Sequence, residues 1–72
     1  MAWCPQVLDE LRGLGAAVEV SGGSLVARLP KSMPVVDLVR CGLLVERAAM
    51  FGYVSVRVSE SGEFIEINAE SD

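Results

Sequence analysis

The stretch AAVEVSGGSLVARL, residues 16–29, decides the fold because it reads as two short strands joined by a tight turn. Gly22-Gly23 is a two-residue link suited to a type I′ turn, whose two central residues both take positive φ. Pairing about this turn sets Val20 opposite Leu25 and gives the hairpin two different faces. The apolar face consists of Ala16, Val18, Val20, Leu25, Ala27 and Leu29, and the half-polar face carries Ala17, Glu19, Val26 and Arg28.

A helix is predicted on each side of this hairpin, over residues 5–14 and 34–51. Pro5 and Pro34 suit the first turn of a helix, where a missing N–H costs nothing. A glycine follows each helix at the position where a left-handed cap residue belongs. In the first helix the apolar residues recur at three- and four-residue spacing, as Val7, Leu8, Leu11 and Leu14.

The second helix is apolar on nearly every side, so its charged residues are the main guide to its orientation. Asp37, Arg40 and Arg47 cluster on one side at about 100° per residue, and this side is expected to face water. Leu44 and Phe51 project among these charges, where a single copy would expose them. The opposite, buried arc is then Val35, Val39, Gly42, Ala49 and Met50, with Glu46 pointing into it. A helix of this kind is expected to meet another chain on one face.

A second hairpin is predicted over residues 53–68, followed by a frayed tail at 69–72. Val54, Val56 and Val58 alternate with Tyr53, Ser55 and Arg57, which is the period of a half-buried strand. A four-residue loop around Glu60-Ser61-Gly62 predicts the pairs Val56 with Ile65, Val54 with Ile67 and Arg57 with Phe64.

These elements predict one small α+β domain over residues 1–72, with the order αββαββ in two layers. One antiparallel sheet of four strands with both helices on one face would bury most of the apolar pattern. Two separate hairpin layers, or strands shared across a dimer, are the alternatives.

The residue types that enzymes use are scarce in this chain. It has no histidine, the commonest general base and a frequent metal ligand. Cys4 and Cys41 are far apart in sequence and lack metal-like spacing, and both are predicted to be reduced thiols. We therefore expect no catalytic residue, cofactor or metal, and a protein that is not an enzyme.

Charge and hydropathy indicate what kind of partner the chain takes. The net charge is −4 and the six basic residues are scattered, which argues against direct nucleic-acid binding. A signal peptide and a membrane span are both absent from the sequence, so we expect a cytoplasmic location and no membrane contact. Hydrophobic residues make up 51% of the chain, more than one small copy is expected to bury, which favours a homodimer or a protein partner.

Residues 7–47 resemble the small N-terminal docking domains of the tubulysin-synthetase (TubC) type, found at subunit junctions of nonribosomal peptide and polyketide synthetases. The resemblance lies in Leu11-Arg12-Gly13-Leu14-Gly15, Val18-Glu19-Val20, Gly22-Gly23, Leu25, Pro30, Pro34 and Leu38. It implies dimerisation and capture of a partner's C-terminal tail beside the first hairpin. Glu19, Val26 and Arg28, with strand 24–29 as a sheet edge, would then form the docking groove. Unlike those domains, this chain adds a second hairpin, which suggests a free-standing relative, of bacterial or phage origin.

Two functions follow as predictions, with a third that is compatible with both. The first is a docking or adaptor module that binds protein through Glu19, Val26, Arg28, Leu44 and Phe51. The alternative is a small acidic phage-type inhibitor, similar to anti-CRISPR proteins, whose Glu60, Glu63 and Glu66 cover a basic surface of its target. The third is a homodimer formed through the apolar face of the second helix.

Overall fold

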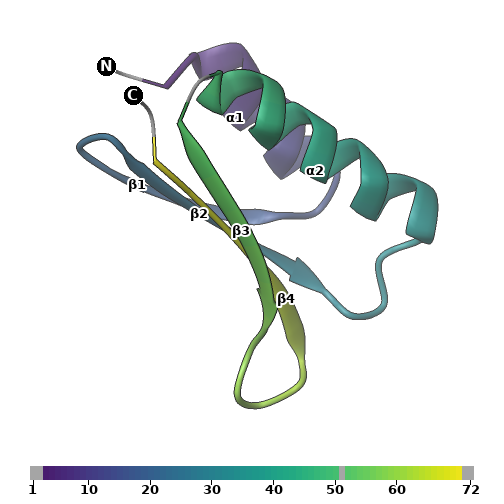
Figure 1. Ribbon diagram of the computed structural model, residues 1–72. Coiled ribbons are helices and arrows are strands. Elements are labelled where there is room, and N and C mark those ends of the chain that lie inside the picture. Colours follow the sequence, from purple (N-terminus) through teal and green to yellow (C-terminus); the bar gives the residue numbers. More distant parts are fainter. Residues whose placement is uncertain (1–2, 51, 71–72) are drawn as a thin grey trace.

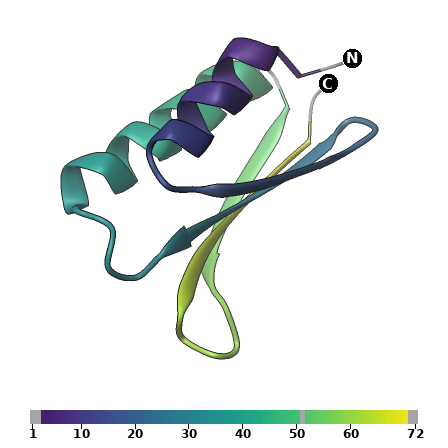
Figure 2. The same ribbon diagram turned by 180° about the vertical axis from the view of Figure 1, so that it is seen from behind.

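The structure is a computed structural model that describes residues 3–50 and 52–70. The elements follow in the order α1 (Pro5–Gly13), β1 (Ala17–Ser21), β2 (Ser24–Pro30), α2 (Val35–Ala49), β3 (Tyr53–Val58) and β4 (Phe64–Glu70). Both helices lie on one face of a single sheet, and the other face of the sheet is uncovered (Figures 1 and 2). The predicted αββαββ order and the α+β class are confirmed.

The four strands form one antiparallel sheet in the order β1-β2-β4-β3, so the two hairpins join through β2 and β4. The expectation that strand 24–29 forms a sheet edge is wrong, because β2 pairs with β1 on one side and β4 on the other. The backbone of β2 is therefore already hydrogen-bonded on both sides, and a partner's peptide cannot be added to it as a further strand. The edges of the described sheet are β1 and β3.

The first hairpin has the predicted register, with Val20 opposite Leu25 and Val18 opposite Ala27. Gly22 takes φ of +59°, a left-handed conformation that suits glycine and allows the two-residue turn. The alternation within β2 is strict, because its residues are buried and half-buried in turn. One face of the hairpin therefore packs under the helices, and the other belongs to the uncovered face of the sheet.

The predicted register of the second hairpin is wrong by two residues. Val56 lies opposite Ile67, and Arg57 lies opposite Glu66 instead of Phe64. The turn is displaced by one residue along the chain, because the Ser59 N–H donates to the Phe64 carbonyl at 2.9 Å. The Ser59 hydroxyl also accepts a bond from the Phe64 N–H at 3.2 Å, which fixes the turn in this position. Since the slip is by an even number, every side chain stays on its predicted face.

Strand β4 also runs two residues beyond the predicted hairpin. Ala69 and Glu70 belong to β4, so the expectation of a frayed tail is wrong for these two residues. Ala69 is buried opposite Val54 and its neighbour in β2 is Leu25, which holds this end of the strand in the sheet. The other two residues of the predicted tail lie outside the described ranges.

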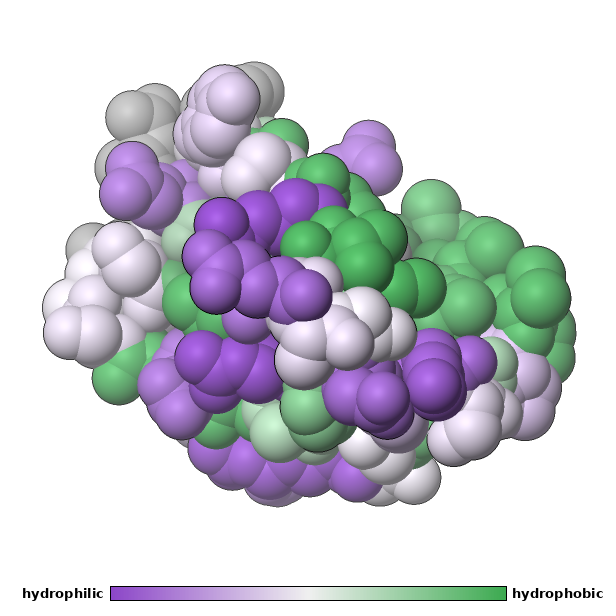
Figure 3. Space-filling view, turned by 90° about the horizontal axis from the view of Figure 1, so that it is seen from below, coloured by the Kyte–Doolittle hydropathy of each residue, from purple (hydrophilic) through white to green (hydrophobic). Residues whose placement is uncertain are grey.

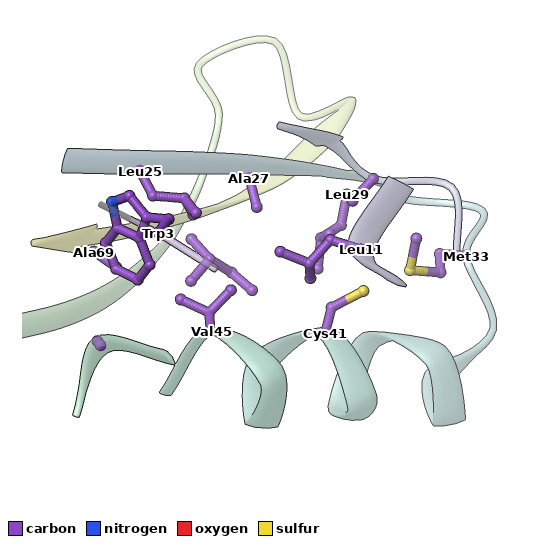
Figure 4. Close-up of a cluster of buried hydrophobic side chains, with 12 residues drawn as sticks. Trp3, Leu11, Leu25, Ala27, Leu29, Met33, Cys41, Val45 and Ala69 are labelled. Atoms are coloured by element: carbon purple, nitrogen blue, oxygen red, sulfur yellow. The ribbon is translucent and has the colours of Figure 1, made fainter. Parts of the chain in front are cut away.

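The core lies between the sheet and the helices (Figure 4). Its buried apolar residues are Trp3, Leu11, Ala16, Leu25, Ala27, Leu29, Met33, Cys41, Val45, Ala49, Ile67 and Ala69. Each element except β1 and β3 contributes at least one of these residues. The two layers are therefore joined by one continuous apolar cluster.

The predicted rotation of α2 is wrong in part, because Arg40 and Arg47 are exposed and Ala49 is buried as expected, but the centre of the buried side is elsewhere. Its buried side is Cys41, Val45 and Ala49, while Leu44 is half-buried against the core. Four residues of the arc that we expected to be buried or inward-facing are exposed, namely Val35, Val39, Glu46 and Met50. The physical reason is that charges can extend from the flank of a helix to water, whereas small residues let the helix lie close to the sheet. Phe51, predicted to be exposed, lies outside the described residues.

Candidate functional site

The uncovered face of the sheet has a row of ion pairs at its centre. The Glu66 carboxylate accepts from Arg57 Nε at 2.8 Å and from Arg28 Nε at 3.2 Å. Glu66 is only 8% exposed, although the sheet face around it is open to water. The hydrogen bond from Arg57 and that from Arg28 lower the pKa of Glu66, and burial opposes this shift. The carboxylate therefore stays ionised and holds β2, β4 and β3 together across the sheet.

Glu19, Val26 and Arg28 lie together on this uncovered face, as predicted for the first hairpin. Arg28 Nη1 donates to Glu19 at 3.1 Å, in addition to the bond with Glu66. These contacts with Glu19, then Glu66, raise the pKa of Arg28. The charges of Glu19 and Arg28 are thus largely satisfied within the domain, which leaves Val26 as the apolar member of the predicted set. Sequence reasoning missed Arg57, because the predicted register did not place it opposite Glu66.

The three carboxylates of the predicted acidic surface do not act together. Glu66 is buried between two arginines, and Glu63 pairs with Lys31 at 3.4 Å. Glu60 lies exposed in the turn between β3 and β4. Two of the three negative charges are therefore balanced by a neighbouring cation.

A shallow hollow of about 460 Å³ lies at one end of the uncovered face. Its sides come from three strands, with Val26 on β2, Asn68 on β4, and Tyr53 and Ser55 on β3. These side chains offer a phenol, an amide and a hydroxyl beside one apolar group. The hollow can receive a side chain of a partner, and Glu70 on its rim lies opposite both Ser24 and Tyr53.

A second apolar stripe runs along the outside of α2, away from the core. We call the residues Val36, Val39, Leu43 and Met50 the α2 face; they are 66%, 54%, 58% and 67% exposed. Their spacing of three, four and seven residues places them along one side of the helix. A helix that covers a sheet in a single copy normally has a polar outer side. The α2 face departs from that pattern.

The free side of β3 is the other apolar surface. Val56 and Val58 point toward the helix layer, since their partners Ile67 and Ile65 belong to the core side of the sheet. They are nevertheless 64% and 66% exposed, because α2 and β3 diverge from their common corner (Figure 1). From the side of the β3–β4 turn, hydrophobic side chains concentrate toward the end of the molecule where α2 begins, beside a broad hydrophilic region (Figures 1 and 3).

The described residues provide little for catalysis or metal binding. Within 3–50 and 52–70, no three Cys, Asp or Glu side chains gather closely enough to hold a metal ion. Cys41 is fully buried, and burial, followed by the charge of Asp37, raises the pKa of its thiol. Cys4 is exposed. None of the described helices has the length and apolar character needed to cross a membrane.

Fold and surfaces together define the class: a two-layer α+β domain with an uncovered sheet face, an exposed apolar helix face and an unpaired edge at β3. The chain matches no protein-family model, no curated protein and no solved structure.

Proposed function

We propose that this chain is a non-catalytic docking or adaptor module whose α2 face binds another protein. The observation that supports this proposal is the pair of apolar stripes on α2, one buried against the sheet and one exposed. Exposed apolar side chains that lie side by side mark a protein-binding surface more often than scattered ones do. This proposal keeps the predicted function but moves the binding surface from Leu44 to Leu43 and its neighbours.

The ends and flanks of the α2 face suit a specific partner. A hollow of about 370 Å³ at its C-terminal end is lined by Leu43, Glu46, Arg47 and Met50. An apolar side chain of a partner fits between Leu43 and Met50, while the carboxylate and the guanidinium select its charged neighbours. We therefore expect the partner to present an apolar helix or groove with charges of both signs at its border.

The test compares two aspartate substitutions at exposed apolar residues. Leu43→Asp places a charge on the α2 face, and Val20→Asp places one on the distant β1, where Val20 is 42% exposed. The tagged chain is used to isolate a binding protein from its native cell, and the affinity of that purified protein is then measured. Leu43→Asp should weaken binding by about tenfold or more, equivalent to about 1.4 kcal/mol, and Val20→Asp should not.

Both variants must first show the circular dichroism spectrum and unfolding midpoint of a folded chain. Equal binding by wild type and Leu43→Asp would remove the α2 face as the binding surface. The resemblance to TubC-type domains predicts docking beside the first hairpin, so it shares the function with this proposal but not the surface. A large synthetase subunit, bound through its C-terminal tail, is the partner that the resemblance predicts.

An acidic inhibitor is still the second function predicted from the sequence. The charge arrangement offers it less support, since Glu63 and Glu66 are each paired with a cation. The two functions differ in their dependence on salt. Binding through acidic side chains should weaken steeply between about 50 mM and 500 mM salt, whereas binding through the α2 face should change little.

A further inference from the structure

We infer that a second copy of this chain pairs with the free edge of β3, antiparallel and about a two-fold axis at Val56, to form one continuous sheet of eight strands. This inference goes beyond the proposed function, because it concerns the sheet edge and not the α2 face. The backbone, the side chains and the charges of β3 each support it.

The unpaired backbone groups of β3 belong to its valines. Ser59 and Phe64 form a hydrogen-bonded pair at the start of the turn, as the bond from the Ser59 N–H shows. Hydrogen-bonded and non-hydrogen-bonded pairs alternate along antiparallel strands. Counting back from Ser59, the odd-numbered residues of β3 bond to β4, and Val54, Val56 and Val58 direct their N–H and C=O groups away from it. An added strand would satisfy these groups.

The same valines leave apolar surface uncovered. Val56 and Val58 are about two-thirds exposed on the helix side of the sheet, although their neighbours Ile67 and Ile65 pack against the core. An added strand with apolar residues at alternate positions would extend the apolar side of the sheet past β3. The free backbone groups and the exposed valines would therefore both be satisfied by an added strand with apolar residues at alternate positions.

Strand β3 itself meets that requirement. Residues 54–58 read Val-Ser-Val-Arg-Val, which has a valine at every inward position and is symmetric in this respect about Val56. Antiparallel pairing centred on Val56 sets Val54 of each copy against Val58 of the other. Each valine then lies opposite a valine of the other copy, and its free N–H and C=O groups form hydrogen bonds with that partner.

The charges favour this register over the others that keep the faces aligned. Arg57 lies opposite Ser55 of the second copy, and Arg57 is the single charged residue of β3. Pairing centred on Arg57 would place two like charges directly opposite each other, which destabilises a strand pair. Pairing centred on Ser55 would leave Val58 opposite a glycine. Two molecules of net charge −4 also meet at a strand that has no acidic side chain.

Strand β3 has few of the features that normally protect a sheet edge, since its one charged side chain, Arg57, lies on the uncovered face and pairs with Glu66. It has no proline, its inward positions carry no charge, and each of its six residues pairs with one residue of β4 without a bulge. The opposite edge, β1, is shorter, with five residues against the six of β3. Of the two edges, β3 is therefore the one that we expect to pair with a second strand.

The surface area that a chain of this size can bury in such an interface indicates a weak dimer. A stable interface takes about a tenth of a small protein's surface from each partner, which for 4688 Å² is about 470 Å². Two such areas together come close to the lower limit of about 1,000 Å² for specific interfaces. Interfaces at this lower limit are typical of weak, transient complexes, although buried area alone does not set the affinity.

Sedimentation of the full chain over a range of concentrations tests the inference. The mass should rise from 7.7 kDa toward twice that value between about 1 µM and about 1 mM. Val56→Asp should keep the chain monomeric over this range, because it places two like charges on the two-fold axis. Val20→Asp, on the other edge, and Leu43→Asp, on the α2 face, should dimerise as the wild type does.

A cross-link tests the register without adding a charge. In a Cys4→Ser background, Val56→Cys should give a covalent dimer on mild oxidation, because residue 56 of each copy lies opposite itself at a distance that a disulfide spans. Val20→Cys in the same background should give none. A wild-type chain that stays monomeric at about 1 mM would overturn the inference, as would a dimer that Leu43→Asp abolishes and Val56→Asp does not. A chain that does not dimerise would not affect the proposal that the α2 face binds a partner, because Leu43→Asp tests that proposal separately.

Discussion

Glu66 is the residue whose environment differs most from what its type suggests. A carboxylate on an open sheet face would normally be solvated, but the side chains of Arg28 and Arg57 lie on either side of it and cover it. Two arginines at one carboxylate leave one positive charge in excess, and the bond from Arg28 to Glu19 balances it. The group of four charges is therefore neutral and ties all four strands, β1 through Glu19, into one network.

Replacing Glu66 by glutamine tests this network through its dependence on pH. The folded chain lowers the pKa of Glu66 below the ordinary value of 4.5, so the stabilisation is fully present above that pH. It is lost as the pH falls through the lower pKa of the folded state. In urea unfolding, Glu66→Gln should be less stable than wild type at neutral pH, and the difference should shrink below about pH 4.5.

Glu60→Gln is the matched control, since Glu60 lies exposed in the turn. The Glu60→Gln variant should unfold at the same urea concentration as wild type at pH 7 and at pH 3. A Glu66→Gln deficit that is the same at pH 7 and pH 3 would show that the loss is one of packing and not of charge.

At the scale of the element, α2 has two apolar sides, and the structure decides which of them supports the fold. Leu43 and Leu44 are adjacent leucines with opposite roles, the first exposed and the second packed against the core. Leu44→Ala should therefore cost about 1–2 kcal/mol of unfolding free energy, and Leu43→Ala no more than about 0.5 kcal/mol. Chemical denaturation of both variants checks this, and the reverse order would restore the rotation predicted from the charges.

The corner between α2 and β3 depends on Gly52. A Cβ atom at this position would overlap the backbone carbonyl of Glu70, which cannot move without disturbing the end of β4. Gly52→Ala should thus destabilise the chain by about 3 kcal/mol, whereas Gly42→Ala, in open space within α2, should stabilise it by about 0.5–1 kcal/mol. Thermal unfolding of the two alanine variants gives the comparison. A tolerated Gly52→Ala would mean that the corner is wider than this contact allows.

Some of these elements could be predicted from the sequence alone, and others could not. The hairpin at 16–29 was predicted with its register, because Gly22-Gly23 allows few alternatives and the two strands agree in phase. The second turn permits more than one position, and the bonds of Ser59 to Phe64 that select one depend on hydroxyl geometry. The rotation of α2 could not be read from a helix that is apolar all round. The pairing of β2 with β4 joins residues far apart in the chain, so local patterns do not determine it.

At the scale of the whole molecule, one core joins both layers, and Cys41 lies within it with no exposed surface. Burial raises the pKa of the Cys41 thiol, so both access and ionisation oppose its reaction. Cys4 is exposed near the start of α1. A thiol reagent at pH 8 should label one cysteine at once and the second only as fast as the chain opens globally. Mass spectrometry of quenched samples follows both sites, and rapid labelling of Cys41 would indicate local opening of α2.

The placement of both helices on one face of the sheet has a consequence for a dimer joined at β3. A two-fold axis perpendicular to the sheet keeps the two α2 faces on the same side of the assembly. A partner that carries two docking segments could then engage both copies at once, with an effective local concentration in the millimolar range for a short linker. Weak contacts at each copy would combine into avidity, and binding would respond sharply to the concentration of the chain itself.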